Sequence, residues 1–297
     1  MSLPAAPFGR LLTAMVTPFK PDGSLDLDGI ATVAHHLAEH GHDGIVVSGT
    51  TGESPTTVTE EDGQIIAAVR GAVGDRLKIV AGVGTNSTAH SIELAQQAAK
   101  AGADGILLVT PYYNKPSQPA VEAHFRTVAE AAGLPTMLYD VPGRTGTTIS
   151  LGVYEALADH ELMIAVKDAV GDLPRASKLA GLGYAVYSGD DILLPGFLAH
   201  GACGLVSVVA HVAGDQLASI IADFGTDPAK ALATYQRLLP AMDAVMGVPN
   251  YGATTAKGAL ELAGVLDNRR VRPPLLELDD GEVAALRTGL QAAGLIS

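Results

Sequence analysis

A lysine stands at the end of a short apolar run, where it could act as a nucleophile. The run at 163–167 is followed by Asp168 and Gly171, which is typical of a strand buried on both faces. In a parallel sheet or barrel, Lys167 would lie at the carboxyl end, where active sites form. Partial desolvation there would lower the pKa of its amine, and a neutral amine can form an imine with a ketone. This segment alone is equally consistent with a surface lysine just past a strand.

Further reactive or ligand-binding groups follow other expected strands. Residues 49–54 read Gly-Thr-Thr-Gly-Glu-Ser, a turn whose amides and hydroxyls, including those of Thr50 and Thr51, could hold a carboxylate. Tyr113 lies in a proline-fixed loop at 110–116. Tyr139 ends another apolar segment and leads to Arg144, whose planar guanidinium suits a carboxylate. All these groups would meet at the same face of a parallel barrel.

Strand and helix patterns alternate along the chain. Apolar, β-branched segments predict eight strands, at residues 10–18, 45–48, 78–83, 106–109, 136–139, 163–167, 184–188 and 205–208. Helical periodicity predicts intervening helices at 26–40, 59–73, 88–101, 119–132, 151–158, 173–182 and 192–200. From Asp227 the pattern is purely helical, with candidates at 228–246, 254–263 and 281–293.

This order favours a (β/α)8 barrel over 1–226 with a C-terminal helical extension over 227–297. Gly-x-x-Gly units at 41–44, 102–105 and 201–204 each close a helix and open a strand. A doubly wound open sheet is the alternative. Its nucleotide fingerprint is incomplete, because Ser87 stands where the last glycine of GxGxxG is needed.

Composition excludes several classes of function. The chain has 297 residues, of which 47% are hydrophobic and 17% charged, as in a compact soluble domain. Its net charge of -13 argues against nucleic acid and anionic membranes as partners. The first seven residues lack the pattern of a signal peptide, and no apolar run could span a bilayer. Cys203 is the only cysteine, so we expect no internal disulfide and a cytoplasmic location.

The lysine, the tyrosines and the Gly-Thr-Thr-Gly-Glu turn together resemble the dihydrodipicolinate synthase family of pyruvate-dependent class I aldolases, in the N-acetylneuraminate lyase superfamily. The resemblance covers nearly the whole chain. It implies a cytoplasmic barrel, commonly a homotetramer. It also implies condensation of pyruvate with L-aspartate 4-semialdehyde to 4-hydroxy-tetrahydrodipicolinate, on the route to diaminopimelate and lysine. The imine would form on the protein itself, so the resemblance implies no cofactor and no metal.

The resemblance also implies roles for individual residues. Lys167 matches the imine-forming lysine, and Tyr139 matches the tyrosine that relays protons, with Thr51 and Tyr113 as its relay partners. In the family, the tyrosine at the position of Tyr113 comes from the neighbouring subunit. The matches to substrate-binding positions are Thr50 and Thr51 for the pyruvate carboxylate, Arg144 for the aldehyde substrate's carboxylate, and Gly189 and Val206 beside the lysine.

Other charged groups are given structural interpretations. Glu53 and Asp168 are expected to stabilise the fold or face solvent. His36 and His40 have helical i, i+4 spacing, but no HExxH motif or cysteine accompanies them, so a solvated helix face is favoured over a metal site.

The chain departs from the family in two places. Many relatives carry an Asn-Pro-x-Pro-x-Lys segment where this chain has 249–254, a change not expected to touch the catalytic set. Lysine-inhibited relatives use a histidine and a glutamate where this chain has Thr59 and His90, although Asn86 and Tyr112 are kept. We therefore expect weak or absent feedback inhibition by lysine.

Other functions remain open at this point. An N-acetylneuraminate lyase or a 2-keto-3-deoxy sugar acid aldolase would share Lys167 and Tyr139, whereas Arg144 and Tyr113 favour the synthase. A catalytically silent small-molecule binding barrel is the alternative from another class, because a fold does not fix a function.

Overall fold

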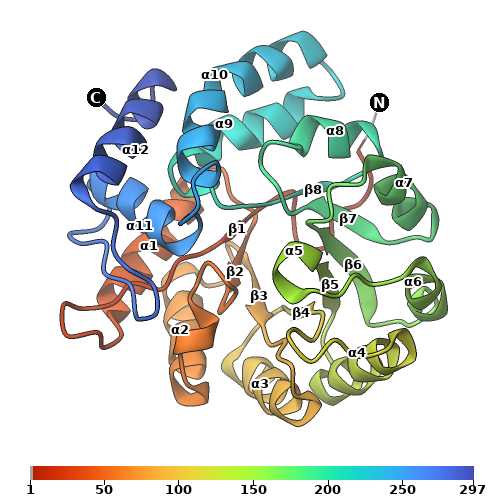
Figure 1. Cartoon of the computed structure of the whole chain (residues 1–297). Coiled ribbons are helices and arrows are strands. Elements are labelled where there is room, and N and C mark those ends of the chain that lie inside the picture. Colours follow the sequence, from red (N-terminus) through yellow and green to blue (C-terminus); the bar gives the residue numbers. More distant parts are fainter. Residues whose placement is uncertain (1–2) are drawn as a thin grey trace.

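The computed structural model describes residues 3–297. Within them, eight parallel strands close into one barrel in chain order (Figure 1). The strands are β1 (Leu11–Ala14), β2 (Gly44–Val47), β3 (Lys78–Gly82), β4 (Gly105–Val109), β5 (Thr136–Asp140), β6 (Met163–Asp168), β7 (Ala185–Ser188) and β8 (Gly204–Ser207). Strand β8 returns to β1, where Leu205 pairs with Leu11. The predicted (β/α)8 barrel is confirmed, and the open-sheet alternative is wrong.

Helices surround the barrel and extend it at the C-terminal end. Those that follow the strands are α1 (Leu27–Glu39), η1 (Ser54–Thr56), α2 (Thr59–Val73), α3 (Thr88–Ala101), α4 (Gln118–Ala132), α5 (Pro142–Thr145), α6 (Leu151–Leu157), α7 (Leu173–Gly181), α8 (Leu194–Ala199) and α9 (Ala210–Asp223). The last three are α10 (Pro228–Met246), α11 (Ala253–Leu262) and α12 (Asp280–Ala292), which lie beyond α9 and α1 in Figure 1. The predicted C-terminal helices are confirmed, whereas the division at 226/227 stays a prediction.

Two local predictions were wrong. Strand β1 ends at Ala14, four positions before Pro18, because the amide of Val16 donates to Nε2 of His211 instead of to a neighbouring strand. Helix α9 was not predicted at all. It contains a non-helical residue, Ala213, with φ of -130°, but its buried residues Leu217, Ile220 and Ile221 have helical spacing, so the signal for this helix was present in the sequence.

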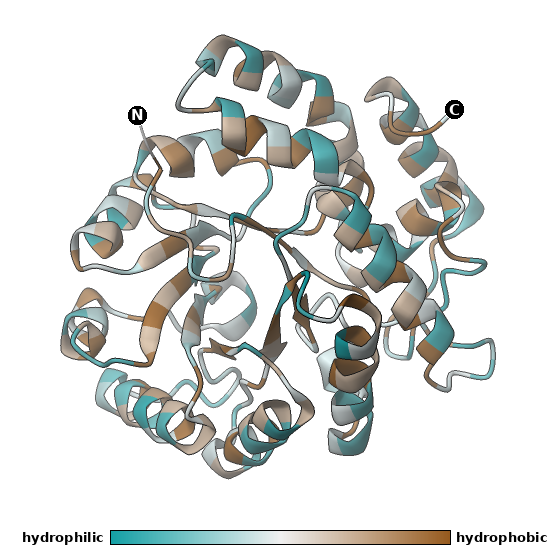
Figure 2. Cartoon of the chain, turned by 180° about the vertical axis from the view of Figure 1, so that it is seen from behind, coloured by the Kyte–Doolittle hydropathy of each residue, from teal (hydrophilic) through white to brown (hydrophobic). Residues whose placement is uncertain are grey.

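Side chains alternate between two apolar layers. In β1, Leu11 packs against the surrounding helices and Leu12 fills the barrel interior. The interior also contains Val46, Val80 and Val206, from three other strands. Figure 2 shows the apolar strands at the centre and helices with one hydrophilic face around them. This filled interior leaves the ends of the strands as the place for a cavity.

A buried ion pair joins the C-terminal extension to the turn after β2. Nζ of Lys257, in α11, lies 2.5 Å from Oε1 of Glu53, and both side chains are almost fully buried. The other carboxylate oxygen of Glu53 accepts from the amide of Arg272 at 2.8 Å. Lys257 and the Arg272 guanidinium also lie 4.3 and 4.2 Å from the ring centre of Phe19. Glu53 thus has the fold-stabilising contacts that the sequence interpretation favoured.

Loss of one partner of this pair should destabilise the protein strongly. We expect Lys257→Met to lower the free energy of unfolding by about 3–5 kcal/mol, because it leaves the Glu53 carboxylate buried without a cation. Urea denaturation of the unchanged protein and of Lys257→Met measures the difference in their free energies of unfolding. The matched control is Lys230→Met, which removes an exposed pair with Asp223 and should move the midpoint little. Equal effects of the two changes would contradict this interpretation.

Candidate active site

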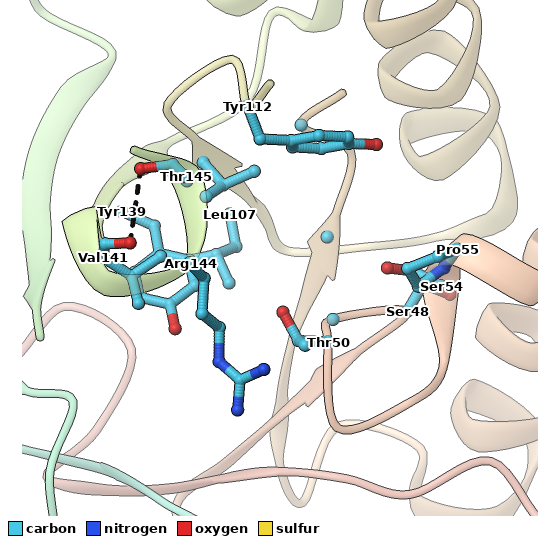
Figure 3. A pocket seen from close by; sticks show the side chains of 14 residues that line it. Ser48, Thr50, Ser54, Pro55, Leu107, Tyr112, Tyr139, Val141, Arg144 and Thr145 are labelled. Atoms are coloured by element: carbon cyan, nitrogen blue, oxygen red, sulfur yellow. Dashed lines mark hydrogen bonds between the residues drawn. The ribbon is translucent and has the colours of Figure 1, made fainter. Parts of the chain in front are cut away.

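Two adjoining cavities open at the carboxyl ends of the strands. Both are lined by Thr50, Tyr139 and Arg144, and the second also by Lys167 and Tyr251. Figure 3 shows the first cavity, with Thr50 and the Arg144 side chain on facing walls and the Tyr139 phenol beside Arg144. Residues from five segments of the chain therefore meet at this mouth.

Lys167 is buried at the end of β6, as predicted. Its side chain lines the second cavity, and Nζ lies 4.4 Å from the ring centre of Tyr139. Burial lowers the pKa of Lys167 to about 8, an effect that Asp191 opposes and Arg144 reinforces. A substantial fraction of this amine is therefore neutral near physiological pH, as a nucleophile requires.

Tyr139 is the neighbour of Lys167 on the adjacent strand. The two residues face each other in the register of β5 and β6. Burial raises the pKa of Tyr139 to about 12, whereas the positive charge of Arg144 lowers it. Within residues 3–297, its hydroxyl makes no hydrogen bond, and none joins it to Thr51 or Tyr113. The phenol is thus held beside the amine with its proton available to a ligand or to a partner group.

The turn after β2 is shaped to receive an anion. The amides of Thr50 and Thr51 donate to no acceptor in the described part of the chain. The turn is closed by hydrogen bonds from the Glu53 amide to the Thr50 carbonyl, 3.1 Å, and from Thr17 Oγ1 to the Gly52 carbonyl, 2.7 Å. Glu53 holds a left-handed φ of 58°, a costly conformation that the buried pair with Lys257 maintains. Free amides at a fixed turn form a site for a carboxylate.

Gly189 and Val206 have different relations to the amine. A Cβ on Gly189 would lie 3.2 Å from Cε of Lys167, so the glycine gives the lysine its room. Val206 is fully buried in the barrel interior, and Val208, two residues further on, lines the cavity instead. Of these two predicted residues, only Gly189 lies on the cavity wall.

Tyr113 is not brought to this cavity by its own chain. Its side chain is 89% exposed, and its backbone holds a left-handed φ of 73°. The adjacent Tyr112 lines the first cavity. The structure of one chain therefore places the Tyr113 ring in solvent and not beside Lys167 or Tyr139.

The segment at 249–254 does touch the site, contrary to the expectation from the sequence. Tyr251 lines the cavity that contains Lys167, and its ring centre lies 4.9 Å from Cζ of Arg144. The expectation was wrong because the loop between α10 and α11 returns to the mouth of the barrel, although it is far in sequence from the strands that carry Tyr139 and Lys167. No motif marked this residue in advance.

Buried carboxylates below the mouth were only partly identified. Asp191 accepts hydrogen bonds from Ser207 and from the Val208 amide and affects the pKa of Lys167, yet only the nearby Gly189 was singled out from the sequence. Asp168 and Asp140 bind Arg175, at 3.2 and 2.5 Å. Burial raises the pKa of Asp140 to about 6, and the positive charge of Arg175 acts against this rise. The structural interpretation of Asp168 fits this buried ion pair.

No group of three or more potential metal ligands occurs within residues 3–297. The sequence had suggested that His36 and His40 lie on a solvated helix face, but both side chains are half-buried. Nε2 of His36 contacts the His211 carbonyl, and Nδ1 of His40 contacts the His36 carbonyl. In the same part of the chain, no helix combines the length and apolar character needed to cross a membrane.

These features define a class of protein: a (β/α)8 barrel with a buried amine, a phenol and an anion-binding turn at one cavity. Residues 7–293 match the model of the Dihydrodipicolinate synthetase family, and the chain belongs to that family. It is 55% identical over 295 residues to a 4-hydroxy-tetrahydrodipicolinate synthase of Kineococcus radiotolerans, covering 98% of this chain and 95% of that protein.

Solved structures of the family have the same fold. A dihydrodipicolinate synthase from Bacillus anthracis is 40% identical with a TM-score of 0.92, covering 96% of this chain and 98% of the other. One from Cyanidioschyzon merolae with lysine bound is 38% identical with a TM-score of 0.94, covering 98% of this chain and all of the other (100%).

The lowered pKa of Lys167 predicts unusual reactivity at moderate pH. In reductive methylation with formaldehyde, we expect labelling of Lys167 to rise with a midpoint near pH 8, because the neutral amine reacts. For an unperturbed lysine, the midpoint of labelling lies at about pH 10.4. Peptide masses across a pH series measure the labelling of Lys167 and of exposed lysines in the same sample. A midpoint for Lys167 that coincides with those of exposed lysines would contradict the burial argument.

Proposed function

We propose that this protein condenses pyruvate with L-aspartate 4-semialdehyde to give 4-hydroxy-tetrahydrodipicolinate, through an imine on Lys167. The observation that carries the proposal is the buried amine of Lys167 facing the Tyr139 ring, in a cavity that also has a free anion-binding turn. The family membership and the 55% identity to a synthase of that name support the same reaction.

The first steps follow from the chemistry of the amine. Nζ of Lys167 attacks the ketone carbon of pyruvate, whose carboxylate is held by the amides and hydroxyls of Thr50 and Thr51. Water leaves and a protonated imine forms, which withdraws electrons from the neighbouring methyl group. Loss of a methyl proton gives an enamine, whose carbon attacks the aldehyde of the second substrate. The amino group of that substrate then attacks the imine carbon, closes the ring and releases Lys167.

Tyr139 moves the protons that these steps require. Its pKa of about 12 favours the neutral phenol, so the hydroxyl first donates a proton and is then poorly stabilised as an anion. The positive charge of Arg144 lowers this barrier, and hydroxyls of Thr51 and Tyr113 would complete the relay. All chemical steps use groups of the protein, with no cofactor assigned.

Arg144 favours aspartate semialdehyde over sugar acids as the second substrate. Within residues 3–297, its guanidinium has no hydrogen bond or ion pair, so its donors are free for a carboxylate. A 2-keto-3-deoxy sugar acid aldolase or an N-acetylneuraminate lyase would instead bind a chain of hydroxyls at this position. The reactive amine argues against a silent binding barrel.

The exposed ring of Tyr113 supports a homo-oligomer, for which we propose a tetramer in the cytoplasm. Its position outside its own barrel suits insertion into the cavity of a neighbouring subunit. The expected weak inhibition by lysine stays a prediction of the sequence.

Trapping the imine tests the proposed mechanism directly. Pyruvate with borohydride should leave a reduced adduct on Lys167, and Lys167→Ala should abolish both the adduct and the condensation, because no other amine lines this cavity within residues 3–297. Peptide mass mapping locates the adduct. Condensation without any adduct on Lys167 would refute the imine mechanism. Comparing aspartate semialdehyde with sugar aldehydes then separates the synthase from the aldolases.

Mixing an impaired variant with an inactive one tests whether Tyr113 acts across an interface. Tyr113→Phe should lower kcat by about 10²-fold, since a proton-relay hydroxyl is lost. Lys167→Ala should be inactive. When the two are mixed and allowed to exchange subunits, activity should partly return, because some cavities then combine an intact lysine with an intact partner tyrosine. Failure to recover activity in proven mixed oligomers would contradict the role across subunits.

A further inference from the structure

Tyr251 is the contribution of the C-terminal extension to the cavity that contains Lys167. It lies in the loop between α10 and α11 and lines that cavity together with Met246 and Gly252. This loop is held by its own hydrogen bonds, from the Tyr251 amide to the Val248 carbonyl and from the Gly252 amide to Oγ1 of Thr255. The ring is therefore anchored at a defined place at the mouth.

The ring of Tyr251 is the contact that holds the Arg144 guanidinium. Cζ of Arg144 lies 4.9 Å from the ring centre, which is the range of a cation–π interaction. Within residues 3–297, the same guanidinium has no carboxylate or carbonyl partner. An exposed arginine without other partners would sample many rotamers, so the ring restricts where its donors point.

We propose that Tyr251 is a positioning residue for the second substrate: its ring holds Arg144 so that the guanidinium faces the cavity above Lys167. The inference rests on the proposed function, because it takes the carboxylate of the aldehyde substrate as the ligand of Arg144. Stacking uses the face of the guanidinium and leaves its edge donors free, so Arg144 can contact the ring and a carboxylate together.

The position of Tyr251 limits its effect to one half of the reaction. Pyruvate is held by the turn at Thr50 and Thr51 and attacked by Lys167, and Arg144 acts on these steps only through its charge, which loss of the Tyr251 ring does not remove. Loss of the ring should therefore impair capture of the aldehyde and leave formation of the pyruvate imine intact. A general loss of structure would impair both, and this difference identifies a positioning role.

The test compares Tyr251→Leu with Tyr251→Phe. Leucine removes the aromatic face, and we expect the KM for aspartate semialdehyde to rise about two- to fivefold, the value of an exposed cation–π contact. Phenylalanine keeps the face and should restore the KM toward that of the unchanged enzyme. Borohydride trapping with pyruvate should be equal in all three proteins, which also shows that each variant is folded.

A second variant asks whether the effect passes through Arg144. In an Arg144→Ala background, adding Tyr251→Leu should raise the KM no further, because the group that the ring holds is already absent. An unchanged KM in Tyr251→Leu, an equal loss in Tyr251→Phe, or fully additive effects in the double variant would each overturn the proposal. An unchanged enzyme without a pyruvate adduct would instead refute the proposed function.

Discussion

Burial of a single amine is the constraint on which the rest of the site depends. The barrel must remove Lys167 from bulk water far enough to lower its pKa, yet leave a cavity beside it. Close packing in the barrel interior provides the burial, and Gly189 provides the space. The carboxylate of Asp191 limits the downward shift of this pKa. These opposing effects keep both forms of the amine accessible near neutral pH.

The C-terminal helices complete the site as well as the core. Glu53 ends the turn that carries Thr50 and Thr51, and its carboxylate is bound by Lys257 from α11. A second contact from the extension, Tyr251 on Arg144, reaches the other side of the cavity. The extension therefore fixes both walls of the mouth, and the same contacts serve stability and substrate geometry.

The sequence was informative wherever local signals agree. Helix 59–73 begins with acidic residues and is periodic throughout, and its ends were correct. Lys167 and Tyr139 were placed at strand ends because apolar runs stop there. Helix α9 was missed although its buried residues Leu217, Ile220 and Ile221 have the spacing of a helix. Tyr251 and the Glu53–Lys257 pair were missed since their partners are about a hundred or more residues away, and no spacing rule relates them.

Part of the cavity wall comes from outside the barrel units, and this origin has an evolutionary consequence. The loop that carries Tyr251 lies outside the eight βα units and can accept substitutions without altering the strands that carry the nucleophile. Substitutions in this one short loop can therefore change the cavity wall next to Arg144 while the strand that carries Lys167 is kept.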